Sequence, residues 1–205
     1  MDRKVYEEYE YVDPDARYTY KGTSVLKNKF DIKDGNLVQE KEYQIAASKL
    51  VELGFMPIEV HTMENILSIH RFIFEEIYEW AGCYRTVNIS KEENAFMAFQ
   101  SFDTGEEYMN SLLRSYYEPG KSKLEIAKHL ASILDNLNYM HPFREGNGRT
   151  QREVIRVLAL AKGFYADINI DIDDEIYHLY MDGTVEGDKS ILTQLFLKIL
   201  EEIED

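Results

Sequence analysis

Residues with chemically useful side chains are concentrated in one twelve-residue stretch, HPFREGNGRTQR, at positions 141–152. Within it, Gly146, Asn147 and Gly148 leave little bulk around the backbone, so consecutive N–H groups can point at a single oxyanion. The residues that follow have the apolar spacing of a helix, and a helix N-terminus attracts phosphate through its unpaired N–H groups and its dipole. The stretch therefore predicts an anion site that suits a phosphate group.

Charged and titratable side chains flank this turn on both sides. Arg149, Arg152 and Arg156 follow at spacings of three and four residues, so they should share one helix face, where planar guanidinium groups suit phosphate oxygens. Glu145 would repel a phosphate directly, but it fits a site in which Mg²⁺ lies between the carboxylate and the phosphates. His141 carries an imidazole, which titrates near neutral pH and can act as a general base.

Each of these features has a simpler explanation when it is taken alone. A Gly-x-Gly turn is usually only a turn, a loop histidine is usually structural, and arginines at helical spacing usually form a solvated face. A histidine, an acid, a Gly-Asn-Gly turn and phased arginines within twelve residues are poorly explained as coincidence. The combination favours a catalytic phosphate site, in which Phe143 is expected to point inward and hold the loop.

The stretch resembles the signature of Fic-domain proteins, with every defining position filled: His141-x-Phe143-x-Glu145-Gly146-Asn147-Gly148-Arg149-x-x-Arg152. The resemblance implies an all-α fold, a helical bundle with a small β-hairpin flap beside the active site. It also implies a protein adenylyltransferase, an enzyme that transfers AMP from ATP to a Ser, Thr or Tyr hydroxyl of a target protein.

The resemblance also implies a role for each motif residue. By matching position, His141 would deprotonate the target hydroxyl, and Glu145 would hold the Mg²⁺ that bridges the ATP phosphates. The backbone of residues 146–148 would form the anion hole. Arg149 and Arg152 would hold the outer phosphates. The expected cofactor is therefore Mg²⁺, with ATP as the substrate.

Gly148 bears on the choice of reaction. In the related Doc branch a lysine replaces this glycine and the reaction is phosphorylation, so the glycine favours nucleotidyl transfer. The motif holds phosphates and says little about the base, which leaves transfer of UMP or phosphocholine open. A catalytically silent Fic fold that binds a nucleotide or a partner is a further alternative, although the histidine and the second arginine are both present.

Composition narrows the class of protein. The 205 residues are enough for one domain with a sizeable core, and a net charge of −15 argues against binding a long nucleic acid. A single cysteine, Cys83, rules out an internal disulfide and fits a reducing cytoplasm. The polar, acidic N-terminus is unlike a signal peptide, and no apolar run approaches the ~20 residues of a membrane helix. We therefore expect a cytoplasmic protein with no membrane partner.

Apolar periodicity predicts helices separated by turn-forming residues. Residues 1–40 lack periodicity and are expected to form an N-terminal extension that packs on the core, with the Fic domain at 41–200. Ile168, Ile170 and Ile172 favour an extended loop, residues 182–188 a turn-rich link, and Ser190 the N-cap of a last helix. The other helices are expected at residues 40–53, 62–80, 103–117, 122–140, 149–160 and 173–181.

The segment after the second expected helix breaks the helical pattern. Thr86, Val87 and Ile89 favour a strand, and the acidic residues that follow favour a turn, which together predict a short hairpin at about 86–100. Its position matches the Fic flap, a hairpin that holds the target peptide by strand addition. By that match, Ser90 and Lys91 are expected near the nucleotide, and Phe96, Met97 and Phe99 beside the target.

Regulation is suggested by what the chain lacks. Many Fic proteins are inhibited by a helix with Ser or Thr, three residues, Glu, then Gly or Asn, whose glutamate pairs with the second motif arginine, here Arg152. Ser48 and Glu52 have this spacing, but Leu53 follows and the segment has the pattern of a core helix. The hypothesis is that a separate small antitoxin supplies the glutamate, so that this chain is the toxin of a pair.

The sequence is compatible with either a monomer or a homodimer.

Overall fold

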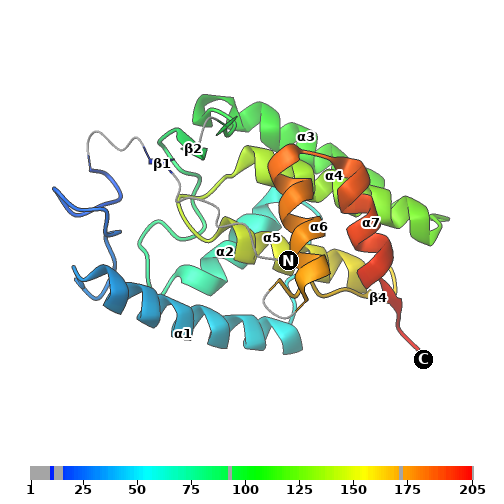
Figure 1. Cartoon of the computed structure of the whole chain (residues 1–205), viewed down its shortest axis with the longest axis horizontal. Helices are drawn as coiled ribbons and strands as arrows, with labels where there is room; N and C mark the ends of the chain where they lie inside the picture. Colours follow the sequence, from blue (N-terminus) through cyan, green and yellow to red (C-terminus); the bar gives the residue numbers. More distant parts are fainter. Residues whose placement is uncertain (1–9, 12–15, 92–93, 171–172, 205) are drawn as a thin grey trace.

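Helices dominate the architecture, as the sequence predicts. The computed structural model describes residues 10–11, 16–91, 94–170 and 173–204. Within them lie seven α-helices, one 3₁₀ helix at Phe99–Ser101 and five short strands (Figure 1). The α-helices are α1 Gly35–Phe55, α2 Met63–Phe74, α3 Phe102–Tyr116, α4 Lys123–Met140, α5 Asn147–Leu160, α6 Asp174–Glu186 and α7 Lys189–Ile199. The all-α class is confirmed.

Helix α4 forms the centre of the bundle. It packs against α3, α5, α6 and α7, while α1 lies along one edge of the molecule and contacts α2 (Figure 1). The buried residues of α4 include Leu130 and Leu134, both fully inside the core. Leu124, which the sequence pattern places on the same apolar stripe, is 45% exposed, because it lies in the first turn at the surface end of the helix. The capping box of Ser122 and Glu125 begins this helix.

The predicted hairpin is present but shorter than expected. Strand β2, Ile89–Lys91, pairs antiparallel with β3, Asn94–Ala95. Strand β1, Glu10–Tyr11, adds to the other edge of β2, which gives the order β1-β2-β3. The pairing of β1 was not foreseen, because two residues carry no readable strand pattern. A second small sheet joins β4, Phe164–Tyr165, to β5, Glu201–Glu202.

Helix α2 ends six residues earlier than the predicted boundary at Trp80. After Phe74 the chain turns, and the N–H of Ile77 bonds to the carbonyl of Phe74 at 2.9 Å. The carbonyl of Ile77 accepts from the backbone N–H of Lys29 at 2.8 Å. Ile77 is fully buried although it is not helical. The apolar periodicity was therefore real, but its last part came from turn residues that pack on the core.

Two helix boundaries near the C-terminus also differ from expectation. Residues 182–186, predicted as part of a link, continue α6, because Gly183 is a contact between helices rather than a turn residue. A Cβ at Gly183 would lie 2.6 Å from the side chain of Leu192 on α7. The N-cap of α7 is Asp188 rather than Ser190, and its carboxylate accepts from the N–H of Ser190 at 2.7 Å. Near the N-terminus, Asp34 caps α1 and starts it earlier than predicted.

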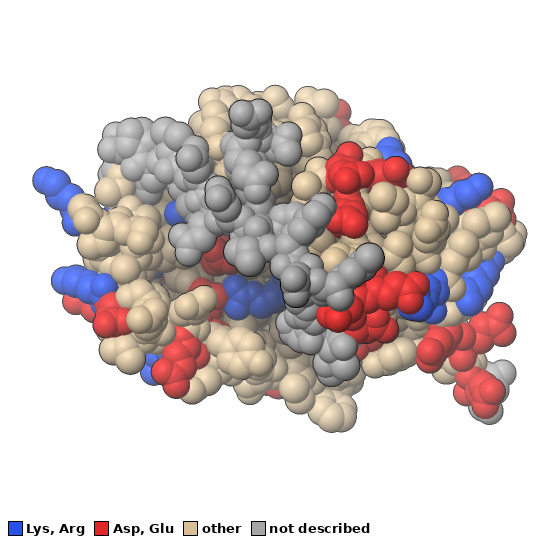
Figure 2. Space-filling model, viewed as in Figure 1, with Lys and Arg blue, Asp and Glu red and all other residues tan. Residues whose placement is uncertain are grey.

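The surface agrees with the strongly acidic composition. On the face drawn in Figure 2, acidic and basic side chains of the described residues are interspersed, and acidic groups gather near the C-terminus. None of the described helices combines the length and apolar character that crossing a membrane requires.

Candidate active site

The motif forms the connection between α4 and α5. His141 follows the last residue of α4 and has a left-handed backbone, with φ at 43°. Gly146 is the N-cap of α5, again with a left-handed φ of 79°. The turn expected at a helix N-terminus is therefore where the sequence places it, with the first N–H groups of α5 beginning at the Gly-Asn-Gly segment. His141 itself is 5% exposed.

Buried side chains hold the loop from inside. Phe143 is 1% exposed, as expected, and its ring stacks on His70 with centroids 3.7 Å apart. The side chain of Asn147 bonds both the N–H and the carbonyl of Phe143, at 3.0 and 2.8 Å. Asn147 therefore fixes the loop through its side chain, while only its backbone remains suited to an anion.

His70 is a structural histidine. Burial lowers its pKa to about 3, so the ring is neutral. Its Nε2 donates to the carbonyl of Glu145 at 3.0 Å, and its Nδ1 accepts from the N–H of Gly82 at 2.8 Å. The histidine on α2 thus fixes the backbone just before the glycine turn.

The two motif arginines and the motif glutamate come together at one cavity, whose lining does not include residues 146–148. Glu145, Arg149 and Arg152 line a hollow of about 500 Å³, together with Glu42 of α1 and Tyr78. Arg149 lies 3.6 Å from the Glu145 carboxylate. Burial, and then the charge of Glu42, raise the pKa of Glu145. Glu42 and Tyr78 were not predicted from the sequence. Nothing in residues 35–55 indicates that α1 faces the motif.

Glu145 fits the role of a carboxylate ligand for Mg²⁺. One of its oxygens accepts from the N–H of Gly146 at 2.8 Å, and its side chain is 36% exposed on the cavity. Magnesium is commonly held by one or two carboxylates together with substrate phosphates. Among the described residues no group of three or more His, Cys, Asp or Glu side chains could hold a metal by itself.

Arg156, expected on the same face as the motif arginines, lies outside this cavity. Seven residues after Arg149, it returns to that face but about 10 Å further along the helix. There its guanidinium pairs with Glu153 at 2.7 Å and donates to the carbonyl of Leu53 at 2.9 Å. Arg156 joins α5 to the end of α1, and the predicted cluster of three arginines is reduced to two.

The flap lies directly over the histidine. The ring of Phe96 stacks on His141, with centroids 3.9 Å apart and an interplanar angle of 22°. The N–H of Met97 donates to the carbonyl of Tyr139 at 2.9 Å, so the flap is tied to the end of α4. Phe99 is half-buried, and its N–H bonds the side chain of Asn88 at 3.1 Å. Phe96 and Met97, two of the three residues expected beside a target, therefore lie next to the histidine or the end of α4, whereas no described contact places Phe99 there.

The two flap residues expected near a nucleotide are less well placed. Ser90 is on β2 opposite Ala95, and it is not among the residues that line the cavity of the motif arginines. Lys91 pairs with Asn94 through the backbone, and its side chain lies outside the described part of the structure. Their contact with a nucleotide stays a prediction.

Arg85 is a site residue that sequence reasoning missed. It is 1% exposed, its guanidinium lies 4.8 Å from the ring of Phe102, and burial lowers its pKa to about 10. It links the end of α4 to the flap, since its side chain donates to the carbonyls of His141 at 2.8 Å, Val87 at 2.6 Å, Met97 at 2.6 Å and Met140 at 3.2 Å. From the sequence alone, an arginine in a loop is expected to be exposed. No sequence signal indicates the burial of Arg85 or its partners.

Replacing Arg85 with methionine should lower the free energy of unfolding by about 4 kcal/mol. The variant leaves several buried carbonyls without donors, and each such group costs about 1–3 kcal/mol. Urea denaturation measures the change. Arg114→Met on α3, an exposed position, is the control and should change stability by less than about 0.5 kcal/mol. Equal losses in the two variants would show that Arg85 does not hold the flap to the histidine loop.

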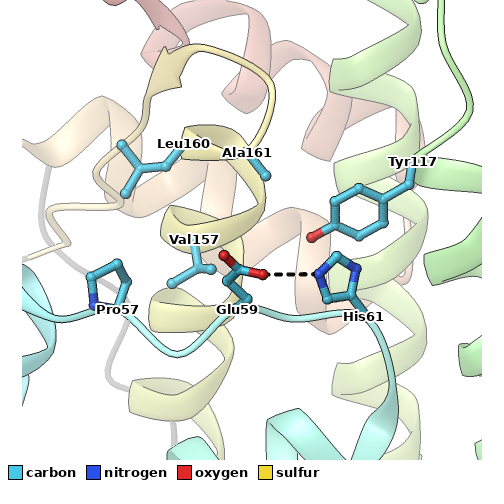
Figure 3. A pocket seen from close by; sticks show the side chains of 7 residues that line it. All are labelled: Pro57, Glu59, His61, Tyr117, Val157, Leu160 and Ala161. Carbon is cyan, nitrogen blue, oxygen red and sulfur yellow. Dashed lines mark hydrogen bonds and ion pairs between the residues drawn. The ribbon is translucent and has the colours of Figure 1, made fainter.

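A second hollow lies apart from the motif. It has a volume of about 370 Å³, and Figure 3 shows an apolar floor formed by α5 beside Tyr117 and a pair of polar side chains. The pair is Glu59 and His61, 3.2 Å apart. None of the motif residues that the sequence singled out lines it, so the cavity beside α1 is the candidate active site.

Comparison with known proteins agrees with this geometry. The sequence model of the Fic/DOC family matches residues 61–159. A probable protein adenylyltransferase from Sinorhizobium fredii, y4lH, is 32% identical over 150 residues, which cover 72% of this chain and 77% of the relative. This chain belongs to the Fic/DOC family. A probable protein adenylyltransferase Fic from Escherichia coli K12 is 26% identical over 186 residues, covering 90% of this chain and 92% of the relative.

The fold also agrees with that of a solved structure. The BepC protein of Bartonella tribocorum, solved with bound AMPPNP, superposes with a TM-score of 0.77 at 24% identity, covering 92% of this chain and 98% of that one. The chain is thus a Fic-type helical bundle with a β-hairpin flap. Its family membership and its relatives make it an enzyme of the nucleotidyltransferase class.

Proposed function

We propose that this chain transfers AMP from ATP to a Ser, Thr or Tyr hydroxyl of a target protein. One observation carries the proposal. The connection between α4 and α5 has the flap on one side, with Phe96 stacked on His141, and the cavity with Glu145, Arg149 and Arg152 on the other. A target and a nucleotide can therefore meet at one loop. The relatives named protein adenylyltransferases support the same reaction.

In the proposed reaction the target hydroxyl attacks the α-phosphorus of ATP. His141 accepts the hydroxyl proton, and a new O–P bond forms while the bond between the α- and β-phosphate groups breaks. Pyrophosphate leaves and the target keeps AMP as a phosphodiester. Arg149 and Arg152 neutralise the β- and γ-phosphates. The N–H groups at the start of α5 face the charge that develops on the phosphates.

We propose Mg²⁺ as the cofactor, held by Glu145. When bound, it would neutralise phosphate charge and orient the nucleotide. The carboxylate beside the two arginines supports this assignment. Replacing Glu145 with glutamine should therefore lower both the Mg²⁺ dependence and the rate of transfer.

The target is expected to bind by extending the flap sheet. In the order β1-β2-β3, strand β3 is an edge, and an edge strand offers unpaired N–H and C=O groups to another chain. Phe96 follows β3 directly and covers His141. A peptide added at this edge would therefore run past the proposed base. The target is a protein segment in extended conformation.

Control by a separate antitoxin is also proposed. The internal Ser48–Glu52 match lies on α1, where Glu52 is exposed and 3.7 Å from Lys49, and Leu53 is buried. Arg152 instead faces a cavity wide enough for a glutamate from another chain. The purified chain should then transfer AMP without a partner. A chain that binds ATP but stays inactive until part of it is removed would contradict an external inhibitor.

The exposed Cys83 supports a reducing, cytoplasmic setting.

Intact-mass spectrometry tests the donor. The purified chain is incubated with Mg²⁺ and ATP, UTP, GTP or CDP-choline in parallel, alone and with a bacterial lysate. An increase of one AMP mass on any protein, with ATP only, is the expected result. An increase with UTP or CDP-choline alone would mean that the chain transfers another group than AMP. The assignment of the site would then stand, and only the donor would change.

A further inference from the structure

Glu42 reaches the candidate site from α1, outside the motif. One of its carboxylate oxygens accepts a charged hydrogen bond from Arg149, and the other accepts from the hydroxyl of Tyr78. Its side chain is 12% exposed and lines the cavity with Glu145. This contact joins residues 107 positions apart, so it exists only in the folded protein.

Arg149 is held from more than one direction. Its guanidinium lies 4.7 Å from the ring of Phe74, which is fully buried, and 3.6 Å from Glu145. Tyr78, 2% exposed, braces the Glu42 carboxylate from behind. A free arginine side chain loses rotamer entropy when it binds a phosphate. In this arrangement much of that entropy has been lost before a nucleotide arrives.

The same contact opposes nucleotide binding through charge. Glu42 and Glu145 bring two carboxylates to a cavity whose described basic residues are Arg149 and Arg152. The positive charge that would attract a triphosphate is therefore largely neutralised. Any phosphate that takes the full charge of Arg149 must compete with Glu42.

We propose that Glu42 is a positioning residue, which fixes the Arg149 guanidinium for the outer phosphates and weakens the binding of ATP in exchange. This inference rests on the proposed function, because it assigns Arg149 to a nucleotide. It predicts opposite effects on two measured quantities. Losing the negative charge tightens ATP binding, while losing the fixed orientation slows transfer.

Two variants separate charge from orientation. Glu42→Gln removes the charge at nearly constant shape, and Tyr78→Phe removes the brace while the charge stays. Glu42→Gln should bind ATP about fivefold more tightly, a difference of about 1 kcal/mol, and show a kcat about tenfold lower. Tyr78→Phe should lower kcat without tighter binding. Glu40→Gln is the matched control, because Glu40 is exposed on the same helix, where its carboxylate accepts from the side chain of Gln44.

Binding is measured calorimetrically with ATP and Mg²⁺ in a His141→Ala background, which needs no transfer. Equal or weaker ATP binding in the Glu42→Gln variant overturns the proposal, as does a kcat equal to that of Glu40→Gln. Thermal unfolding of each variant identifies loss of fold. If the unaltered chain binds ATP but transfers nothing, the proposed function fails, while tighter binding by Glu42→Gln would still show that Glu42 competes for Arg149.

Discussion

Replacing His141 with alanine is expected to lower the rate of AMP transfer by about a thousandfold and to leave ATP binding within twofold of the unaltered chain. A positioned general base contributes about 10²- to 10⁴-fold to such a reaction. Binding should persist, because Glu145, Arg149 and Arg152 line the phosphate cavity and His141 does not. Initial rates with α-labelled ATP and calorimetric titration with ATP measure the two quantities.

A second substitution at His141 separates the effect of backbone strain from the loss of the imidazole. His141 has a φ of 43°, a conformation that asparagine adopts more readily than alanine. His141→Asn should therefore be as inactive as His141→Ala but more stable. His61→Ala, at an exposed histidine in the hollow of Figure 3, should transfer at the normal rate. Loss of ATP binding in both His141 variants would contradict the role of a base and would indicate a binding residue.

Replacing Gly146 with alanine is expected to lower the free energy of unfolding by about 4 kcal/mol and to abolish transfer. The glycine has a φ of 79°, which costs a residue with a side chain about 1–2 kcal/mol. The added Cβ would also fall inside the contact distance of the Phe74 ring, which is fully buried and cannot retreat. Overpacking of this kind costs about 1–3 kcal/mol. Thermal and urea unfolding measure the loss.

The second motif glycine provides a matched control. A Cβ at Gly148 would lie 3.3 Å from the end of the Arg152 side chain, which is flexible, and its backbone is helical. Gly148→Ala should therefore keep its stability within about 1 kcal/mol, while ATP binding weakens because bulk enters the phosphate site. Similar stability losses in the two variants would show that the close approach to Phe74 does not determine the fold of this loop.

The sequence predicts the parts of this site that are local. Residues 141–152 contain the histidine, the acid, the glycine turn and the arginines in one short stretch, and short stretches have few possible geometries. The same holds for helix starts such as Thr62 and Ser122, where the capping residue and the first turn are adjacent. The helical bundle and the hairpin were predicted from patterns of this kind and from the family resemblance.

Contacts between distant segments were not predicted. Arg85 and Glu42 each have a partner more than fifty residues away, and their own neighbours in sequence give no hint of burial. Helix α2 ends before Ile77, whose carbonyl accepts from the backbone N–H of Lys29 in the N-terminal segment. Apolar periodicity carries no information about such a contact. The grouping of Arg156 with the other two arginines was wrong for a related reason. Spacing fixes the helix face of a residue, but it does not say what lies beside each turn.

The origin of the transferred group is the most direct test of the account. The purified chain and His141→Ala are incubated with Mg²⁺, a cell lysate as the source of targets, and ATP labelled at either the α- or the γ-phosphate. The α-label should appear on protein, the γ-label should not, and His141→Ala should transfer neither. Transfer of γ-label would mean phosphorylation and would contradict AMP transfer, whatever else the fold suggests.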